Sequence, residues 1–500
     1  METEVGDRLS NPHFSYAPFL LLSLLFLWPL ALNGHPFYVG DSASYLRGGA
    51  AGVDTGMLML REWWQGLFIS SGGPGTAADE GSSAVVAAAI GQAGGTRSLA
   101  YSLLTYLLRM PGQSLLALVV FQAGAAALVV VLVQRLMAPH ASGRGRLAMM
   151  ACLALLTPVA WSVTTAMPDI LAGVALLGSI PLTLCLERLG VVERIALILL
   201  LALAITAHVS HLPLALATLA TGAAARFLLR RPNRAAATRD ALWILSAPLL
   251  ALTASFALSY VGFGTASVAP KRYPILLARS VSDGPGLRYL QSHCETERYA
   301  ICEIFGTNFP THPREFLWGP NGVRYRATPG QMERIRAEEW SIVRRAAMEY
   351  PMLQLDSSTR NFLRQFGSFG LGKVDFRAAL VVGPTGRVDL VNVSDDRPQL
   401  RMWLSGVIYV VFGASLVILY RMRRRLTELE RAALIVAGAG LVANAAICGI
   451  LSGVADRYQA RVAWVIPFLA MMILLKNWSE QPASVGAGTA KGVLSKLTGV

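Results

Sequence analysis

Two aspartates stand beside apolar runs, in positions from which a carboxylate could act as a base. Asp41 lies in GHPFYVGDSASYLRGG, residues 34–49, directly after the first apolar run, 19–32. Asp169 lies in TTAMPDILAG, at the start of a later run. A carboxylate can take a proton from a hydroxyl when burial or neighbouring charges tune it. Each aspartate is also explained as a capping or first-turn residue of a helix, and for Asp41 alone that role is favoured.

Two histidines three residues apart occur in ITAHVSHLPL. At this spacing His208 and His211 share one face of a helix, from which they could donate hydrogen bonds to a phosphate. A metal site would need a third ligand, and the metal set, if one exists, is Asp41, Asp169 and His208. The alternative, with equal weight, is that both histidines bond to backbone at a helix end broken by Pro213.

Two arginines four residues apart lie in LSGVADRYQARVAWVIP, residues 451–467. Arg457 and Arg461 share one helix face, with Tyr458 beside them. Arginine in a short loop on the outer side goes against the usual charge bias of membrane proteins. A bound anion would explain the pair, because guanidinium groups suit phosphate or carboxylate. A salt bridge to a nearby aspartate is the alternative.

A further cation lies in the amphipathic segment RSLAYSLLTYLLR, residues 97–109. Arginines bracket this segment too closely for an easy membrane crossing, so we expect a helix lying in the interface. Arg97 and Tyr101 would then add a guanidinium and a phenol to the other polar clusters. Together these clusters predict one site for an anionic, lipid-anchored substrate.

The composition explains why such groups would lie at a membrane. The chain has 500 residues, of which 54% are hydrophobic and 15% charged, with a mean hydropathy of +0.48. These values indicate a multi-span membrane protein. The net charge of +14 comes from arginines between apolar runs, where the positive-inside rule places them, so no nucleic-acid partner is expected.

The apolar runs set the expected architecture, an all-α polytopic membrane protein with about ten transmembrane helices. The first run lacks a cleavage site and is expected to remain as a span. Further runs lie at 114–133, 147–167, 170–186, 195–212, 213–225, 241–262, 402–420, 432–452 and 462–475.

Orientation follows from the basic loops between these runs. With a cytoplasmic N-terminus, the inside loops are 134–146, 187–194, 226–239 and 421–431, and all but the second are clearly net basic. The polar clusters then all lie on the outside. The expected divisions are an N-terminal transmembrane module with its first outer loop at 35–113, an extracytoplasmic domain, C-terminal transmembrane helices and a cytoplasmic tail, at 1–262, 263–400, 401–476 and 477–500.

The 263–400 block is expected to be a mostly helical α+β domain between the seventh and eighth spans. Its residues 329–350 have helical spacing, and 379–393 read as a hairpin around Gly-Pro-Thr-Gly. Cys294 and Cys302 fall in this block, and a disulfide between them is plausible if the block is extracytoplasmic, whereas free thiols are expected if it is cytosolic.

The polar clusters, taken in order, resemble the motifs of type-C glycosyltransferases (GT-C fold), in particular the protein mannosyltransferase and lipid A aminoarabinose transferase branch. GDSASYL resembles the first outer-loop motif of that family, and RSLAYSLL is similar to the basic segment that follows. AMPDILAG, HVSHLPL and DRYQARVAWVIP resemble its later turns, with histidines where the family has lysine. The resemblance covers roughly 40–225 and 440–475, while 263–400 matches nothing known to us.

The resemblance implies a sugar transferase of the bacterial cytoplasmic membrane with an outward-facing site. The donor would be a polyprenyl-phosphate-linked sugar, and the acceptor a glycan, lipid or protein. Asp41 would be the general base, and Asp169 would orient the acceptor or bind a divalent cation. His208, His211 and the arginines would stabilise the leaving phosphate, with Arg97, Tyr101 and Tyr458 beside them.

Other functions fit parts of the same pattern. A transporter or flippase of lipid-linked glycans would suit the basic outer mouth, but it should also place polar groups in the middle of the membrane. The apolar runs are nearly free of charge, which favours an enzyme at one face. A glycan polymerase or ligase, or an assembly role for 263–400, are the remaining alternatives.

Overall fold

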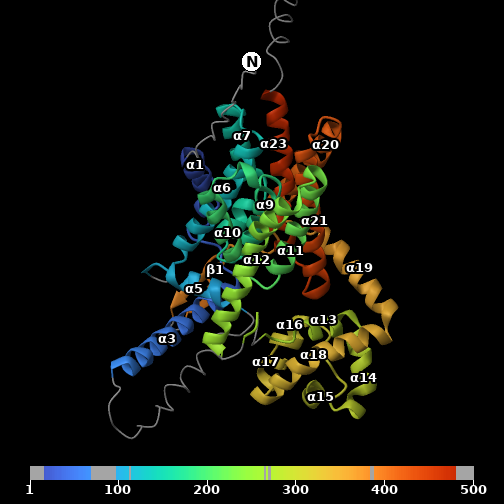
Figure 1. The fold of residues 1–500 in the computed structure, drawn as a ribbon. Coiled ribbons are helices and arrows are strands. Elements are labelled where there is room, and N and C mark those ends of the chain that lie inside the picture. The colour runs from blue at the N-terminus through green and yellow to red at the C-terminus, as the bar shows by residue number, and fades with distance from the viewer. Residues whose placement is uncertain are drawn as a thin grey trace, which may run out of the picture.

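The computed structural model describes residues 16–68, 97–111, 114–263, 266–268, 272–382 and 388–479. Most of this part is helical, and it contains one two-stranded sheet. An apolar helical bundle carries a smaller helical unit at one end (Figure 1).

The bundle is formed by the helices of the predicted spans and their short extensions. In chain order these are α1 Tyr16–Phe26, α2 Leu30–Asn33, α6 Leu116–Met137, α7 Gly143–Leu156, α8 Val159–Thr164, α9 Asp169–Leu184, η2 Leu186–Arg188, α10 Val191–Thr206, α11 His211–Arg230, α12 Arg234–Phe263, α20 Pro398–Met422, α21 Glu428–Leu451, α22 Arg457–Ala463 and α23 Val465–Ser479.

Seven helical segments of the described chain are long and apolar enough to cross a membrane. They are Tyr16–Asn33, Leu116–Met137, His211–Arg230, Arg234–Val261, Pro398–Met422, Glu428–Leu451 and Arg457–Trp478. Helices α7, α9 and α10, where spans were also predicted, have only 14, 16 and 16 residues. The prediction of an all-helical polytopic membrane protein is confirmed to this extent, while ten crossings and a GT-C fold stay predictions.

Helix α9 is the centre of the bundle, and all of its residues are buried. A helix that is apolar on every side is stable only when other helices surround it. Two glycines allow those neighbours to approach closely. A Cβ on Gly173 would lie 2.4 Å from the carbonyl oxygen of Arg461, and a Cβ on Gly440 of α21 would lie 2.3 Å from Leu176 of α9.

The basic loops gather at one end of the bundle, which we call the basic end. There Arg188 donates to the Leu136 carbonyl at 3.0 Å and Lys476 pairs with Glu430 at 3.1 Å, and all four residues line one cavity. The helical unit lies at the opposite end, below the bundle in Figure 1. This opposite end, which we call the site end, also receives the start of α9.

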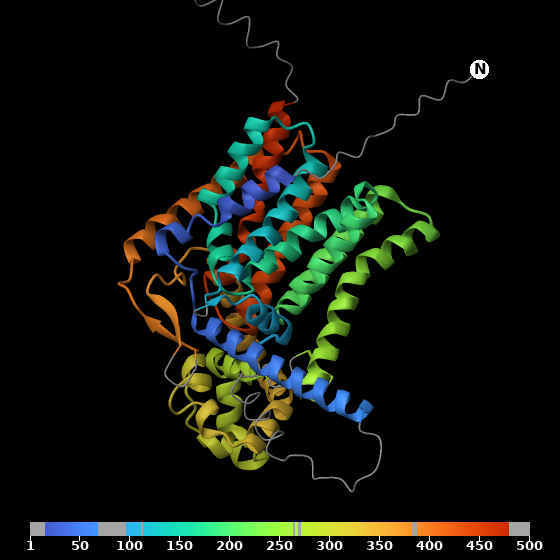
Figure 2. The same cartoon turned by 90° about the vertical axis from the view of Figure 1, so that its left-hand side faces the viewer.

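Helix α3 Gly40–Phe68 runs across the site end and projects beyond the bundle (Figure 2), and the short helix α5 Leu99–Leu107 lies against it. The helix predicted over 97–109 is present as α5. It packs on α3 so closely that a Cβ on Gly49 would lie 2.1 Å from the Ser102 carbonyl oxygen. Most of the loop between these helices lies outside the described residues, and so do residues 480–500.

The helical unit comprises α13 Ile275–Asp283, α14 Pro285–Glu297, α15 Ala300–Phe305, α16 Pro313–Trp318, α17 Val323–Arg326 and α18 Pro329–Glu349. It has its own apolar core, separate from that of the bundle. The helix predicted over 329–350 is α18, and Thr328 caps it. A disulfide joins Cys294 of α14 to Cys302 of α15, the pair that the sequence suggested.

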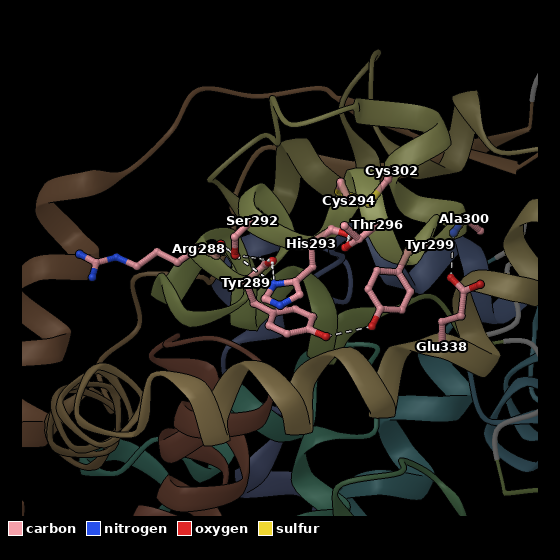
Figure 3. Close-up of a disulfide and its surroundings, with 10 residues drawn as sticks. All are labelled: Arg288, Tyr289, Ser292, His293, Cys294, Thr296, Tyr299, Ala300, Cys302 and Glu338. Carbon is pink, nitrogen blue, oxygen red and sulfur yellow. Dashed lines mark hydrogen bonds between the residues drawn. A yellow bond between two sulfur atoms is a disulfide. The ribbon is translucent and has the colours of Figure 1, made fainter.

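Hydrogen bonds reinforce the surroundings of this disulfide (Figure 3). The hydroxyls of Tyr289 and Tyr299 lie 3.0 Å apart, and the ring of His293 stacks on Tyr289 with 4.3 Å between centroids. The backbone N–H of Ala300 donates to Glu338 of α18 at 2.8 Å. The disulfide is therefore part of a packed region of the unit.

After α18 the chain returns to the bundle through α19 Pro351–Gly367 and the strands β1 Ala378–Val382 and β2 Val388–Asn392. The strands pair antiparallel, with Leu380 opposite Leu390, as predicted for 379–393; their turn lies outside the described residues. Arg47 of α3 donates to the Val388 carbonyl at 2.7 Å. The hairpin thus ties the 263–400 block to α3.

Candidate functional site

The segment before α3 is held against the turn before α9. The Phe37 N–H donates to the Thr164 carbonyl and its carbonyl accepts from Ala166 N–H, both at 2.9 Å. The hydroxyl of Ser42 donates to the Ala166 carbonyl at 3.0 Å. These bonds fix the first turn of α3 beside the first turn of α9, and this brings Asp41 close to Asp169.

The predicted acidic and basic residues form one continuous charge network at the site end. Asp41 forms an ion pair with Arg97, and its second oxygen lies 3.5 Å from Arg457. Arg457 also reaches Asp169 at 3.8 Å, and Arg461 lies 3.3 Å from the other oxygen of Asp169. Segments far apart in the sequence are therefore joined by alternating charges.

The inner half of the network is enclosed by protein. Arg461 is 1% exposed and Asp169 is 6% exposed. Arg461 also donates to Asn444 of α21 at 2.9 Å and to Ser210 at 3.1 Å. A charge in such a place must be paired and hydrogen-bonded to be tolerated, and this set of acceptors meets that need.

The outer half of the network is partly open. The side chains of Arg97, Arg457 and Asp41 are 20, 24 and 28% exposed. Beneath them lie aromatic rings: the Arg457 guanidinium is 5.0 Å from the centroid of Tyr458, and Arg97 is 5.9 Å from that of Tyr45. A ligand can therefore reach Asp41 and its two guanidinium partners.

A cavity of about 30 Å³ opens beside Asp169 and Arg457. Its opposite wall is the loop that follows α19, which contributes Lys373. Within the described part of the chain Lys373 forms no ion pair, and its side chain is exposed. The Gly372 N–H of the same loop donates to Asp456 at 3.1 Å, which holds the loop in place.

The cations of this region outnumber the carboxylates. Counting the three arginines of the network with Lys373 against Asp41, Asp169 and Asp456 leaves one positive charge in excess. The cavity has room for one or two water molecules, so a larger ligand must bind at the open side of the network or displace the loop. The arrangement suits a singly charged or doubly charged anion.

His208 joins the network indirectly. Its Nδ1 accepts from the Ser210 N–H at 3.2 Å and lies 2.8 Å from the Ser210 hydroxyl, which in turn accepts from Arg461. Because a backbone N–H can only donate, the proton of the neutral ring is on Nε2. Burial, and then the charges of Arg461, Arg97 and Arg457, hold the pKa of His208 well below its usual range.

His211 and Tyr101 lie behind the network. The Nδ1 of His211 is 2.7 Å from the Ala204 carbonyl of α10, and the side chain is fully buried. Tyr101, also fully buried, donates to Gln122 at 2.7 Å, and its ring packs edge-on against Tyr45. Both residues support the walls of the site, and neither lines the open side that Asp41 and Arg457 share.

The structure offers little for the metal set of Asp41, Asp169 and His208. In the described ranges no three histidine, cysteine or acidic side chains gather closely enough to hold a metal ion. Both aspartates face guanidinium groups, and the Nδ1 of His208 faces Ser210. The observed partners of the carboxylates are thus arginines.

Three important residues of the site were not found from the sequence: Asn444, Ser210 and Lys373. Asn444 is a polar residue inside an apolar run, which is a usual sign of function in a membrane helix. Lys373 follows Gly370-Leu371-Gly372 in the hydrophilic block, and only the return of α19 to the bundle places it here. No local pattern distinguishes Ser210.

Long apolar helices, with charged groups gathered at one end, define a multi-pass membrane protein. Comparisons with protein-family models, curated proteins and solved structures found no match to this chain. The function must therefore be argued from the site itself.

Proposed function

We propose that this protein is a glycosyltransferase that moves a sugar from a polyprenyl-phosphate carrier to an acceptor hydroxyl. The proposal extends the motif resemblance to the GT-C enzymes. The observation that supports it is the position of Asp41, an accessible carboxylate held between Arg97 and Arg457, both of which a phosphate could also contact.

The reaction is a single displacement at the sugar. The oxygen of the acceptor hydroxyl attacks the anomeric carbon while its proton passes to Asp41. The bond from that carbon to the phosphate oxygen breaks, and the carrier phosphate leaves with the electron pair. Arg457 and Arg97 stabilise the negative charge that grows on the leaving phosphate. Lys373 on the facing loop would bind the charge that the donor phosphate already carries before the reaction.

Asp41 suits the role of base better than Asp169 does. Asp169 is almost fully buried and is engaged by the buried Arg461, so it orients Arg457 from behind. Asp41 shares its guanidinium partners with the expected phosphate position. When those guanidinium groups turn to a phosphate, an oxygen of Asp41 becomes free to accept the proton of the acceptor hydroxyl.

The disulfide supports an outward-facing site. Disulfides persist in oxidising compartments, and the bond between Cys294 and Cys302 lies in the unit at the site end. The basic loops lie at the opposite end, as expected for a cytoplasmic face. Both features favour a site on the outer side of a bacterial cytoplasmic membrane, facing an acceptor that is a glycan, a lipid or a protein.

A transporter or flippase of the same lipid is the second candidate. In the described helices, however, the charge network lies where α3, α9 and α22 begin and not halfway along the spans. A transporter needs polar groups that its substrate meets on the way across. A polymerase or ligase would share the proposed chemistry and differ only in its acceptor.

The test uses the full-length protein in lipid nanodiscs with a panel of polyprenyl-phosphate sugars and extracted envelope acceptors. We expect release of carrier phosphate, and a loss of about 100-fold or more in its rate for Asp41→Asn. Asp54→Asn is the matched control, because Asp54 is an exposed carboxylate further along α3. We expect it to keep the full rate.

Lys373→Met should weaken donor binding, raising KM more than it lowers kcat, because Lys373 contacts only the phosphate end of the donor. A folded Asp41→Asn protein that releases carrier phosphate at the rate of the Asp54→Asn control would refute the proposal. Movement of the intact lipid-linked sugar across the bilayer, without release, would support the transporter instead.

A further inference from the structure

Helix α19 has its polarity reversed relative to an ordinary surface helix. Its buried residues are polar and occur at every fourth position: Ser357, Asn361 and Gln365. Its exposed face carries large apolar side chains, with exposures of 74, 61, 61 and 39% for Met352, Leu355, Leu363 and Phe366. A soluble surface helix shows the opposite arrangement, with its apolar stripe toward the core.

The polar face is fixed inward by specific bonds. The side chain of Gln365 donates to the Ala455 carbonyl at 3.0 Å and accepts from the Ala455 N–H at 2.9 Å. Asn361 donates to Asp283 of α13 at 3.0 Å. A Cβ on Gly449 of α21 would lie only 2.7 Å from the Asn361 carbonyl oxygen, so α19 packs tightly on a candidate span.

The C-terminal end of α19 lies beside the apolar part of another candidate span. The Tyr409 hydroxyl of α20 donates to the Gly367 carbonyl at 3.0 Å and accepts from the Phe369 N–H at 3.1 Å. Tyr409 lies six residues beyond Trp403, or about 9 Å along the helix axis. Trp403 is 74% exposed near the start of α20, a position typical of the membrane interface.

We propose that α19 is embedded in the membrane leaflet at the site end, with Leu363 and Phe366 against lipid acyl chains. Continuity with the outward-facing side chains of α20 supports lipid as the occupant: Val410, beside Tyr409, is 71% exposed. Arg364 is exposed along the same helix and can reach lipid phosphates with its long side chain, whereas Arg360 pairs with Asp356 one turn earlier.

The embedding has a consequence for the site. The loop that lines the cavity and carries Lys373 begins directly after α19, at Ser368. Lipid contact would therefore hold this loop at a fixed depth beside Arg457. The proposal concerns only the membrane contact and stands whether or not the protein transfers a sugar.

Spin labelling in nanodiscs tests the embedding. Cys152 is replaced by Ser, while Cys185 and Cys448 are buried and stay. A nitroxide is attached at Leu363→Cys. Its rate of collision with oxygen, which is concentrated in lipid, is compared with its rate of collision with nickel ethylenediaminediacetate, which stays in water. Phe366→Cys on the same face provides a second site.

Two matched positions calibrate the result. Val410→Cys on α20 should report lipid, and Met348→Cys, 72% exposed on α18 in the helical unit, should report water. We expect the oxygen-to-nickel ratio at position 363 to equal that at 410 and to exceed that at 348 several-fold. A ratio like that at 348 would overturn the proposal. Low collision rates with both reagents would also overturn it, since protein, such as a second copy, would then cover the face.

Discussion

Replacing Arg461 by Met tests whether the buried half of the charge network holds the site end together. The change keeps a long side chain and removes the guanidinium. Asp169 then keeps only Arg457, at 3.8 Å, and the oxygens of Asn444 and Ser210 lose a donor. No water reaches these groups readily, because Arg461 is 1% exposed.

The expected loss is about 3 kcal/mol in the free energy of unfolding. Removing one partner of a buried ion pair costs about 3–5 kcal/mol, chiefly because the other charge stays buried. The low end applies here, because Arg457 still neutralises part of the Asp169 charge. Adding Asp169→Asn removes that remaining charge, so we expect the double variant to recover about 1–2 kcal/mol.

The assay is reversible unfolding of the purified protein in mixed detergent micelles, followed by circular dichroism. Arg97→Met is the matched control, because its ion pair with Asp41 is 20 and 28% exposed and is expected to contribute no more than about 1 kcal/mol. If Arg461→Met destabilised the protein no more than Arg97→Met, or if the double variant were less stable than Arg461→Met, the reasoning would be refuted.

Three further predictions follow from other contacts. Gly173→Ala should lower stability by about 1–3 kcal/mol in the same assay, because its Cβ would meet the Arg461 carbonyl at 2.4 Å; an unchanged midpoint would contradict the close packing of α9 on α22. Replacing Cys294 and Cys302 together by Ala opens a short loop, with a sequence separation of 8. This should lower the stability of the helical unit by about 2–3 kcal/mol, seen as a thermal transition at a lower temperature. Stability should fall as the pH drops below about 6.5, because the pKa of His208 is lowered in the folded protein and the unfolded chain therefore takes up the proton first. The contribution of His208 to this loss is no more than about 1.4 kcal/mol per pH unit. His208→Gln should flatten this part of the plot of stability against pH.

The sequence predicted most helices because long apolar runs carry a strong signal. The runs at 114–133 and 432–452 correspond to α6 and α21 within a few residues. The run at 147–167 was less informative, since Thr157 and Pro158 break it into α7 and α8. Hydropathy alone does not show such a break.

The sequence also predicted part of the site, because charged residues beside apolar runs are easy to recognise. Asp41, Asp169, Arg457 and Arg461 are conspicuous as charged groups beside apolar runs, and they are the residues that meet. Which of them is accessible depends on packing, so the sequence did not separate the buried Arg461 from the partly open Arg457. The inverted polarity of α19 was also missed, since its outward apolar face reads as the core face of a soluble helix.

The charge network has a consequence for biogenesis, because its members are made at very different times. Asp169 enters the membrane region 292 residues before Arg461, and Asp41 precedes Arg457 by 416 residues. Until the last span is synthesised, the acidic residues lack these partners. A chain that stops short of α22 would thus leave the Asp169 carboxylate uncompensated within its bundle, at a cost of several kcal/mol that only the last span removes.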